Sequence, residues 1–160
     1  MLLQLSSPDG FRYIGAVNSF ADLRALTPAS NGAIVNLRGW RAGSNLGGGL
    51  FVGMLSAATD DGGVVASSGG SYHWRRIIGS VVAVEHFGAT GDGSTDDSDS
   101  IQSALASGSL SVTSIAQTKK YFRITKTINI TTDNQTFSLN RCELNMDDQT
   151  GLKSHLSITK

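Results

Sequence analysis

Acidic residues are concentrated in one short stretch of the sequence, at Asp92, Asp96, Asp97 and Asp99. Glycoside hydrolysis needs two carboxyl groups about 5–10 Å apart on either side of the scissile bond, and neighbouring residues of one segment cannot easily flank a sugar. Gly91 and Gly93 supply a tight turn, and Asp or Thr residues ahead of a helix accept hydrogen bonds from its free N–H groups. The stretch therefore favours a turn that caps a helix over a pair of catalytic carboxylates.

A calcium loop is a weaker interpretation of the same stretch. Counted from Asp92, the sixth and twelfth positions hold Asp97 and Ser103, where an EF-hand needs Gly and Glu. The three histidines are far apart in the sequence, without a Cys or Glu at ligand spacing. The Gly-rich stretches lack the Lys-Ser/Thr pair of a phosphate-binding loop. We expect no metal, no cofactor and no catalytic residue.

Aromatic and basic residues are mixed between Tyr72 and Arg76, as they are in sugar-binding and nucleic-acid-binding sites. Together with Trp40, the side chains of Tyr72 and Trp74 would suit stacking on sugar rings. Alternation places Trp74 and Arg76 on one face of a strand and Arg75 on the other, which an ordinary strand also explains. Both interpretations remain open at this point.

Composition narrows the class of protein. The 160 residues include 13 basic and 13 acidic side chains, so no chain-wide basic field attracts nucleic acid. The 19 glycines, with abundant Ser and Thr, favour turns and strands over a helical bundle. No apolar run approaches the roughly 20 residues of a membrane span, and the single cysteine, Cys142, excludes an internal disulfide. We expect a mainly β protein that binds neither nucleic acid nor membrane.

The first 80 residues indicate a small β-rich module with one short helix. Ser19 precedes the helical segment 20–26 as its N-cap, Asp22 is the acid of a capping box, and Pro28 ends the helix. Period-two alternation and short apolar runs between Gly- and Asp-rich turns then predict strands. These strands are expected within residues 33–38, 50–52, 64–66 and 72–78.

A second unit is expected over residues 81–160, after the pattern breaks near residue 80. Thr95 or Asp96 is expected to cap a helix whose apolar residues recur at i, i+3 and i+4, and Gly108 marks its end. The buried face of this helix is predicted to consist of Ile101, Ala104 and Leu105.

Beyond the helix, apolar residues alternate with period two in short runs that polar turns divide, without intervening helices. These runs hold Phe122 and Ile124, Ile128 and Ile130, Phe137 and Leu139, then Cys142, Leu144 and Met146. The pattern is that of a β-solenoid at its beginning, because each coil needs a neighbour to bury its apolar face. The short stack predicts that the sequence is a fragment of a longer protein.

Two sets of segments resemble known families. Residues 86–97 (HFGATGDGSTDD), 101–105 (IQSAL) and 121–124 (YFRI) resemble the opening of pectate-lyase-like, right-handed parallel β-helix proteins. Residues 20–28, 47–51 and 74–78 resemble the amino-terminal module of bacteriophage tailspikes of the polysaccharide-depolymerase type, which commonly precedes such a β-helix.

The resemblance implies a mainly β fold with a tailspike amino-terminal module over residues 1–80. Residues 81–160 would form the β-helix entrance, with a capping helix and the first rungs. The residues that the resemblance assigns to this entrance and cap are Phe87, Gly88, Gly91, Asp92, Gly93, Thr95, Asp96, Asp97, Ile101 and Leu105.

The resemblance also implies a function. The protein would be a homotrimeric component of the phage tail, made in the bacterial host cytoplasm and carried in the virion. Its amino-terminal part would join the tail, baseplate or another spike protein to a β-helix that binds and degrades bacterial surface polysaccharide, as a hydrolase or a lyase. The chain itself would then serve structure and assembly, without activity of its own.

Two alternatives remain open. A polysaccharide-degrading enzyme within this chain would depend on Glu143, Asp147 and Asp148. A carbohydrate-binding module would use Trp40, Tyr72 or Trp74 as stacking platforms.

Overall fold

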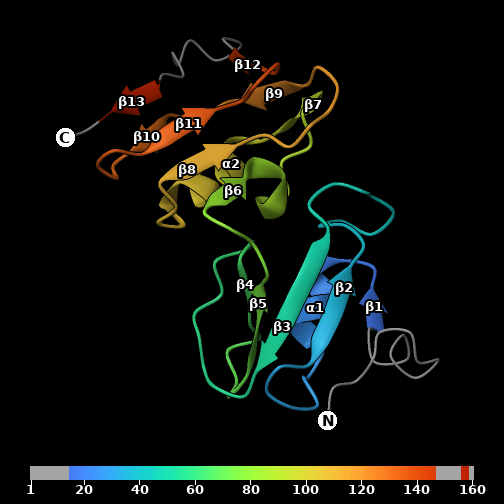
Figure 1. Cartoon of the computed structure of the whole chain (residues 1–160). Helices are drawn as coiled ribbons and strands as arrows, with labels where there is room; N and C mark the ends of the chain where they lie inside the picture. The colour runs from blue at the N-terminus through green and yellow to red at the C-terminus, as the bar shows by residue number, and fades with distance from the viewer. Residues whose placement is uncertain (1–14, 147–155, 159–160) are drawn as a thin grey trace. The chain divides into compact units, whose positions relative to one another are not determined.

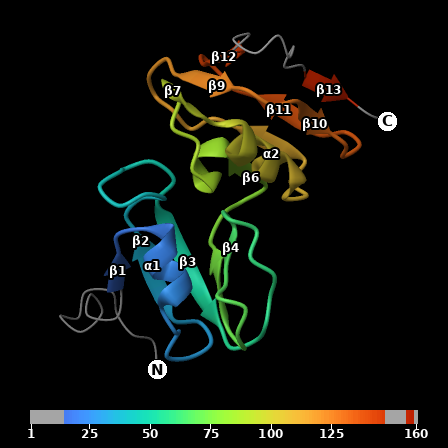
Figure 2. The same ribbon diagram turned by 180° about the vertical axis from the view of Figure 1, so that it is seen from behind.

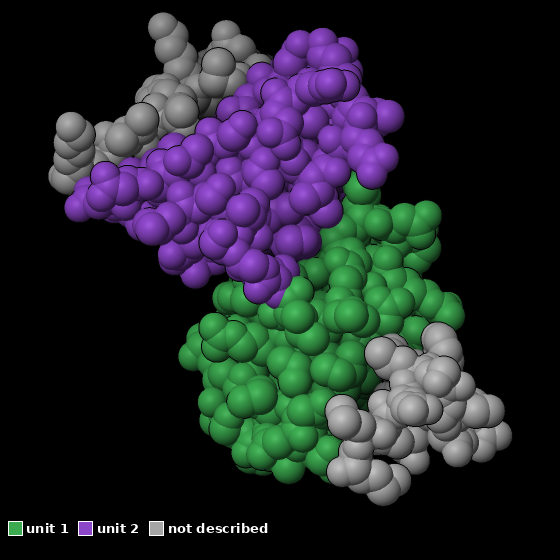
Figure 3. All heavy atoms as spheres, in the orientation of Figure 1, with its two compact units in different colours: residues 1–77 green, residues 78–160 purple. Residues whose placement is uncertain are grey.

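The structure of the chain is a computed structural model that describes residues 15–146 and 156–158 (Figure 1). The chain divides into two compact units, residues 1–77 and 78–160 (Figure 3). Short β-strands dominate both units, and the described part of each unit contains one α-helix. The predicted mainly β class is confirmed.

Unit 1 is built around a five-stranded sheet. Its strands lie in the order β1 (Gly15–Val17), β2 (Ile34–Leu37), β3 (Gly49–Met54), β5 (His73–Arg76) and β4 (Val65–Ala66). β1 runs parallel to β2, and the other neighbouring strands are antiparallel. Helix α1 (Phe20–Ala25) lies across one face of the sheet, as the two opposite views show (Figures 1 and 2).

Helix α1 begins where the sequence predicts. Ser19 is its N-cap: Ser19 Oγ accepts a hydrogen bond from Asp22 N–H at 3.1 Å and donates one to Asp22 Oδ2 at 2.8 Å. The helix ends at Ala25, because Leu26 is extended with φ −82° and ψ 122°. Pro28 follows two residues later and disfavours helical backbone in the residue before it. The predicted helix and N-cap are confirmed.

The core of unit 1 packs around α1 and the buried side chains of the sheet. Phe20 on the helix and Phe51 on β3 meet edge to face, with ring centroids 6.1 Å apart. Gly53 allows a close approach, because a Cβ there would lie 2.4 Å from Pro28 Cβ. The buried members of this core are Phe20, Leu23, Val35, Leu37, Phe51, Ala66 and Trp74.

Unit 2 is a stack of parallel strands in three narrow sheets. The first sheet contains β6 (Val81–Ala83), β8 (Ser111–Thr113) and β11 (Thr136–Ser138). The second contains β7 (Asp92–Asp96), β9 (Tyr121–Ile124) and β12 (Glu143–Met146), and the third β10 (Ile128–Ile130) and β13 (Leu156–Ile158). Along the chain, β8, β9 and β10 belong to the first, second and third sheet in turn, and β11, β12 and β13 repeat this order. Successive coils therefore stack on one another, as predicted.

Apolar residues of successive coils are in register. Val82, Val112 and Phe137 occupy one column of the first sheet, and Phe122 pairs with Leu144 in the second. Val82, Val112 and Phe122 are buried. Each coil therefore covers the apolar face of the coil before it, which is the stabilising contact of a solenoid.

Helix α2 (Ser98–Ala106) takes the place of a first strand in the third sheet. The first two sheets begin with β6 and β7, whereas α2 packs against β10. Gln102 Nε2 donates to the Asn129 carbonyl at 3.1 Å, and Gln102 Oε1 accepts from Asn129 N–H at 2.8 Å. One side-chain amide thus makes the two hydrogen bonds that a neighbouring strand would make, and the helix covers the sheet edge.

Several elements differ from the sequence analysis. Segment Asp92–Asp96, expected as a turn ahead of a helix, forms strand β7 because it pairs with β9 at Tyr121 and Arg123. Strands β1 and β8 were not predicted. The N-cap of α2 is Asp97, so the prediction that Thr95 or Asp96 holds that position is wrong. Tertiary pairing extends both residues into β7 and overrides their weak strand propensity.

Candidate functional site at the entrance to the stacked strands

The entrance turn, residues 88–97, connects the short 3-10 helix η1 (Val84–Phe87) to α2 and is closed by a buried carboxylate. Asp97 Oδ1 lies 2.7 Å from Thr90 N and 3.2 Å from Thr90 Oγ1, and Oδ2 lies 3.0 Å from Gly91 N. Burial raises the pKa of the Asp97 carboxyl, and the hydrogen bonds from Thr90 and Gly91 oppose that shift. Asp97 therefore ties the beginning of the turn to the start of the helix.

Asp92 organises the exposed part of the entrance turn. Its Oδ1 accepts from the backbone N–H groups of Ser94 at 2.8 Å and Thr95 at 2.7 Å, and Oδ2 accepts from the Thr95 hydroxyl at 2.7 Å. The N–H groups of Thr95 and Ser94 hold the pKa of the Asp92 carboxyl well below its usual range. An aspartate bound to its own following backbone is a turn-forming residue, so its charge stabilises local structure.

Asp96 connects the start of α2 to the next coil. Its Oδ1 accepts from Ser98 N–H at 3.0 Å and the Ser98 hydroxyl at 2.5 Å, and Oδ2 accepts from the Thr125 hydroxyl at 2.6 Å. Burial alone raises the pKa of the Asp96 carboxyl, but the hydrogen bonds from Ser98 and Thr125 outweigh it and lower the pKa to about 2.

We expect unit 2 to lose stability as the pH falls from 4 towards 2. The Asp96 pKa of about 2 in the folded chain lies below the ordinary value of 3.8, so folding favours the ionised carboxyl. That stabilisation is complete above the unfolded pKa and is lost as the pH falls through the folded pKa. Hydrogen exchange of the Tyr121 and Arg123 amides in β9 measures it. Asp96→Asn should weaken this acid dependence, and an unchanged profile would contradict the assignment.

Glycines fix the path of the entrance turn. Gly91 has φ +60°, and a Cβ there would lie 2.8 Å from Lys120 Cβ and 3.0 Å from the Phe122 ring. Gly88 ends η1 in the left-handed region at φ +94°, and Gly93 has φ +78°. Gly91 combines a left-handed backbone with a close neighbour, so a side chain is excluded there on two grounds.

The ten residues assigned to the entrance lie together in unit 2. Phe87, Ile101 and Leu105 are buried, the three glycines bend the chain, and the three aspartates accept the hydrogen bonds described above. Thr95 contributes a backbone N–H and a hydroxyl to Asp92. Their arrangement suits a structural closure, and their role as a β-helix entrance stays a prediction.

A buried polar column runs through three successive coils and was missed by the sequence analysis. Glu85 is 1% exposed, with Oε1 2.5 Å from Ser114 Oγ and Oε2 accepting from Ile115 N–H at 3.2 Å. Ser114 Oγ lies 3.6 Å from Cys142 Sγ. The column residues are 29 and 28 positions apart, one per coil. From the sequence, this spacing would predict contact between these residues only if the length of one coil were already known.

In unit 1, the buried guanidinium of Arg76 joins two loops to the sheet. Nε donates to the Gly63 carbonyl at 2.9 Å, Nη1 to Gly48 at 2.7 Å and Nη2 to Gly47 at 2.8 Å. The guanidinium carbon lies 4.5 Å from the Phe51 ring centroid. Burial lowers the pKa of this group to about 10. The sequence analysis gave Arg76 no structural role.

Trp74 corrects the expectation of a sugar-stacking side chain at this position. Its side chain is 3% exposed, and the indole Nε1 donates to the Leu26 carbonyl at 2.7 Å. The ring packs beneath Gly53 in the core and offers no face to a sugar. The ordinary-strand interpretation of this segment is the one that the structure supports.

Trp40 and Tyr72 are half-buried. The Trp40 ring stacks on Phe20 with centroids 6.1 Å apart, and the Arg41 guanidinium lies 5.0 Å from the Trp40 centroid. The Tyr72 hydroxyl is within 3.5 Å of Ser68 Oγ. Sugar stacking by either ring stays a prediction.

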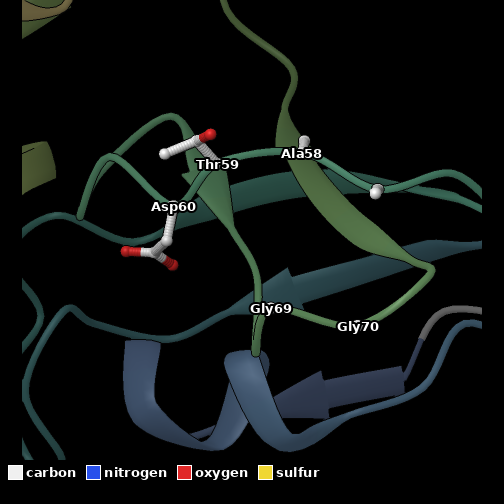
Figure 4. Close-up of a pocket in the computed structure, with 6 residues that line it drawn as sticks. Ala58, Thr59, Asp60, Gly69 and Gly70 are labelled. Carbon is white, nitrogen blue, oxygen red and sulfur yellow. The ribbon is translucent and has the colours of Figure 1, made fainter.

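A surface hollow of about 540 Å³ lies in unit 1 (Figure 4). It is lined by Ala57, Ala58, Thr59, Asp60, Gly69 and Gly70. Asp60 is its ionisable member, and both its oxygens are engaged: Oδ1 accepts from Arg24 Nη2 at 2.6 Å and Gly62 N at 3.0 Å, and Oδ2 accepts from Ser67 N at 2.8 Å. The carboxylate is thereby used in tying loops to α1, which leaves it poorly suited to acid–base chemistry.

The carboxylates proposed for an enzyme in this chain do not form a site in the described residues. Glu143 on β12 is exposed and pairs with Lys119 at 2.5 Å, and Asp147 and Asp148 lie outside the described residues. Within residues 15–146 and 156–158, no three His, Cys, Asp or Glu residues are grouped to hold a metal ion. None of the helices described is long and apolar enough to cross a membrane.

Comparison with known proteins agrees with this architecture. Residues 16–79 match the model of the phage tail protein small four-stranded β-sheet domain. The chain is 45% identical over 95 residues to the amylovoran biosynthesis protein AmsF of Erwinia amylovora, covering 58% of this chain and 13% of that protein. It is 35% identical over 71 residues to the capsule KN4-specific depolymerase of Klebsiella phage KN4-1, covering 44% and 8%.

The crystal structure of the enzymatically active domain of bacteriophage CBA120 tailspike protein 4 matches with a TM-score of 0.73 and 27% identity, over 96% of this chain. The chain has the amino-terminal architecture of a phage tailspike. The resemblance inferred from the motifs is thereby confirmed. The chain therefore spans only a small part of its relatives, namely 13% of the Erwinia protein, 8% of the Klebsiella phage depolymerase and 21% of the crystallised tailspike chain.

Proposed function

We propose that the chain is the amino-terminal structural and assembly part of a homotrimeric phage tailspike. Residues 1–80 form its virion-proximal module, and residues 81–160 form the entrance to a β-helix. The observation that carries this proposal is the capped stack of parallel strands, which follows a unit that matches a phage tail domain. A solenoid with one covered end is extended coil by coil from the other end.

The β-helix is proposed to bind and degrade bacterial surface polysaccharide, as a hydrolase or a lyase. Similarity to a capsule-specific depolymerase supports this substrate class. The described chain is proposed to have no activity of its own, because its carboxylates serve structure. Asp92, Asp96 and Asp97 hold the entrance turn, and Glu143 is paired with Lys119.

The virion-proximal module is proposed to contact the phage tail, the baseplate or another spike protein, after synthesis in the host cytoplasm. The family match of residues 16–79 supports a place in the virion tail. A net charge of zero argues against nucleic acid as a partner, because phosphate contacts need an excess of basic side chains.

Light scattering behind size exclusion tests the proposed trimer. We expect a mass of about three times 16.8 kDa that does not change over a concentration series. Threefold association is favoured because two small units bury little apolar surface for their length. A monomer at every concentration would contradict the proposal for this chain.

A further inference from the structure

Strand β4 forms one edge of the sheet in unit 1 (Figure 1). It runs antiparallel to β5, with Val65 opposite Arg75. Arg76 N–H donates to the Val64 carbonyl at 2.7 Å, so the backbone groups of Val64 point towards β5. Successive residues of an antiparallel strand alternate in this direction, so the N–H and the carbonyl of Val65 point away from the sheet. An edge strand offers such outward groups to any strand that approaches it.

Asp61 binds both outward groups of Val65. Asp61 Oδ1 accepts from Val65 N–H at 2.8 Å, and Asp61 N–H donates to the Val65 carbonyl at 3.3 Å. The same Oδ1 also accepts from Gly63 N–H at 2.9 Å and from Val64 N–H at 2.8 Å. One aspartate therefore makes the hydrogen bonds that a further strand would make at this edge.

Asp60 binds the other end of the edge and fastens the loop to the rest of unit 1. Ser67 N–H, just beyond β4, donates to Asp60 Oδ2 at 2.8 Å. Arg24 of α1 donates from Nη2 to Asp60 Oδ1 at 2.6 Å, and Trp40 Nε1 donates to the Gly62 carbonyl at 2.8 Å. We call residues 60–63 the edge loop. These contacts hold the edge loop in place along β4.

We propose that Asp60 and Asp61 keep the β4 edge closed against the β4 edge of a second copy of this chain. Strand β4 is Val-Ala and carries none of the Lys or Pro residues that commonly protect an edge, so its protection depends on the edge loop. Two open β4 edges would pair antiparallel about a twofold axis, because each presents the N–H and the carbonyl of the same residue.

Asp61→Ala tests this proposal in the full chain, because it removes the acceptor of the Val65 N–H. We expect the mass by light scattering to rise by about twofold or more over a concentration series, while the mass of the unsubstituted chain stays constant. Adding Val65→Pro to this variant removes the outward N–H, and proline is tolerated on an edge strand. The double variant should return to the mass of the unsubstituted chain.

Asp61→Asn is the matched control. It removes the same charge but keeps a side-chain oxygen that accepts from Val65 N–H, so its mass should stay constant. Equal association of Asp61→Asn and Asp61→Ala would overturn the proposal, because the loss of a charge would then explain the association. The comparison with the unsubstituted chain holds whatever the mass of that chain is, so this inference stands independently of the proposed trimer.

A cooperative urea transition first establishes that Asp61→Ala keeps the fold of unit 1. A folded Asp61→Ala variant of constant mass overturns the proposal, and so does association that survives Val65→Pro. Hydrogen exchange in the unsubstituted chain decides the case in which Asp61→Ala does not fold. The Val65 and Ser67 amides should exchange at least about tenfold more slowly than in an unstructured peptide. Unprotected amides at these two residues would show that the edge is open.

Discussion

Replacing Arg76 by leucine is expected to destabilise unit 1 strongly. The substitution removes the donors for the carbonyls of Gly47, Gly48 and Gly63. Each of the three buried carbonyls left unpaired costs about 1–3 kcal/mol, so the total loss is about 3–9 kcal/mol. A unit of 77 residues has a free energy of unfolding of roughly 4–12 kcal/mol. One side chain thus controls a large share of the stability of the unit.

Urea unfolding followed by tryptophan fluorescence measures this effect selectively. Both tryptophans of the sequence, Trp40 and Trp74, lie in unit 1, so the signal reports that unit alone. Arg76→Lys should be less severe, because an ammonium group still reaches part of the carbonyl set but cannot reproduce the planar fork.

The neighbouring residue provides the matched control. Arg75→Leu changes an exposed guanidinium and should alter the free energy of unfolding by no more than about 0.5 kcal/mol. If Arg76→Leu were as stable as Arg75→Leu, the three carbonyls would have to be hydrogen-bonded to water instead, and the structural role assigned to Arg76 would be wrong.

The parts of the fold that could be predicted from the sequence depend on local signals. Helix α1 can be predicted because Ser19, Asp22 and Pro28 lie within a few residues of it. Strands β9 and β10 can be predicted because their apolar residues alternate and face one core. Strand β7 cannot be predicted, because Asp92 to Asp96 has the composition of a turn and becomes a strand only by pairing with β9.

The candidate site shows the same division. The sequence shows that the entrance turn contains turn-forming glycines and aspartates. It does not show which aspartate is buried, because burial depends on contacts between elements. Asp97 binds Thr90 and Gly91, whereas Asp92 binds residues that follow it. Trp74 was placed correctly on a strand, but whether its face is open depends on where α1 packs. The Glu85–Ser114 contact joins residues 29 positions apart, beyond any local pattern.

Asp97→Ala is expected to open the entrance turn and strongly destabilise unit 2. It removes the acceptor of hydrogen bonds from Thr90 N, Thr90 Oγ1 and Gly91 N. Hydrogen bonds to a charged group contribute about 1.5–3 kcal/mol each, and two backbone N–H groups are left unpaired, so a loss of about 3–6 kcal/mol is expected. The first strand of the second sheet then loses its anchor to α2, and the coil stack is no longer closed at that end.

Labelling of the Cys142 thiol in urea measures the loss, since this single cysteine lies in unit 2 and is half-buried in the third coil. The labelling midpoint should fall while the tryptophan signal of unit 1 keeps its own midpoint. Asp99→Ala is the matched control: its carboxylate is 81% exposed and pairs with Lys126 at the surface, so the change should be below about 1 kcal/mol. Equal midpoints for Asp97→Ala and Asp99→Ala would show that Asp97 does not hold the entrance, because only the buried carboxylate leaves unpaired N–H groups behind.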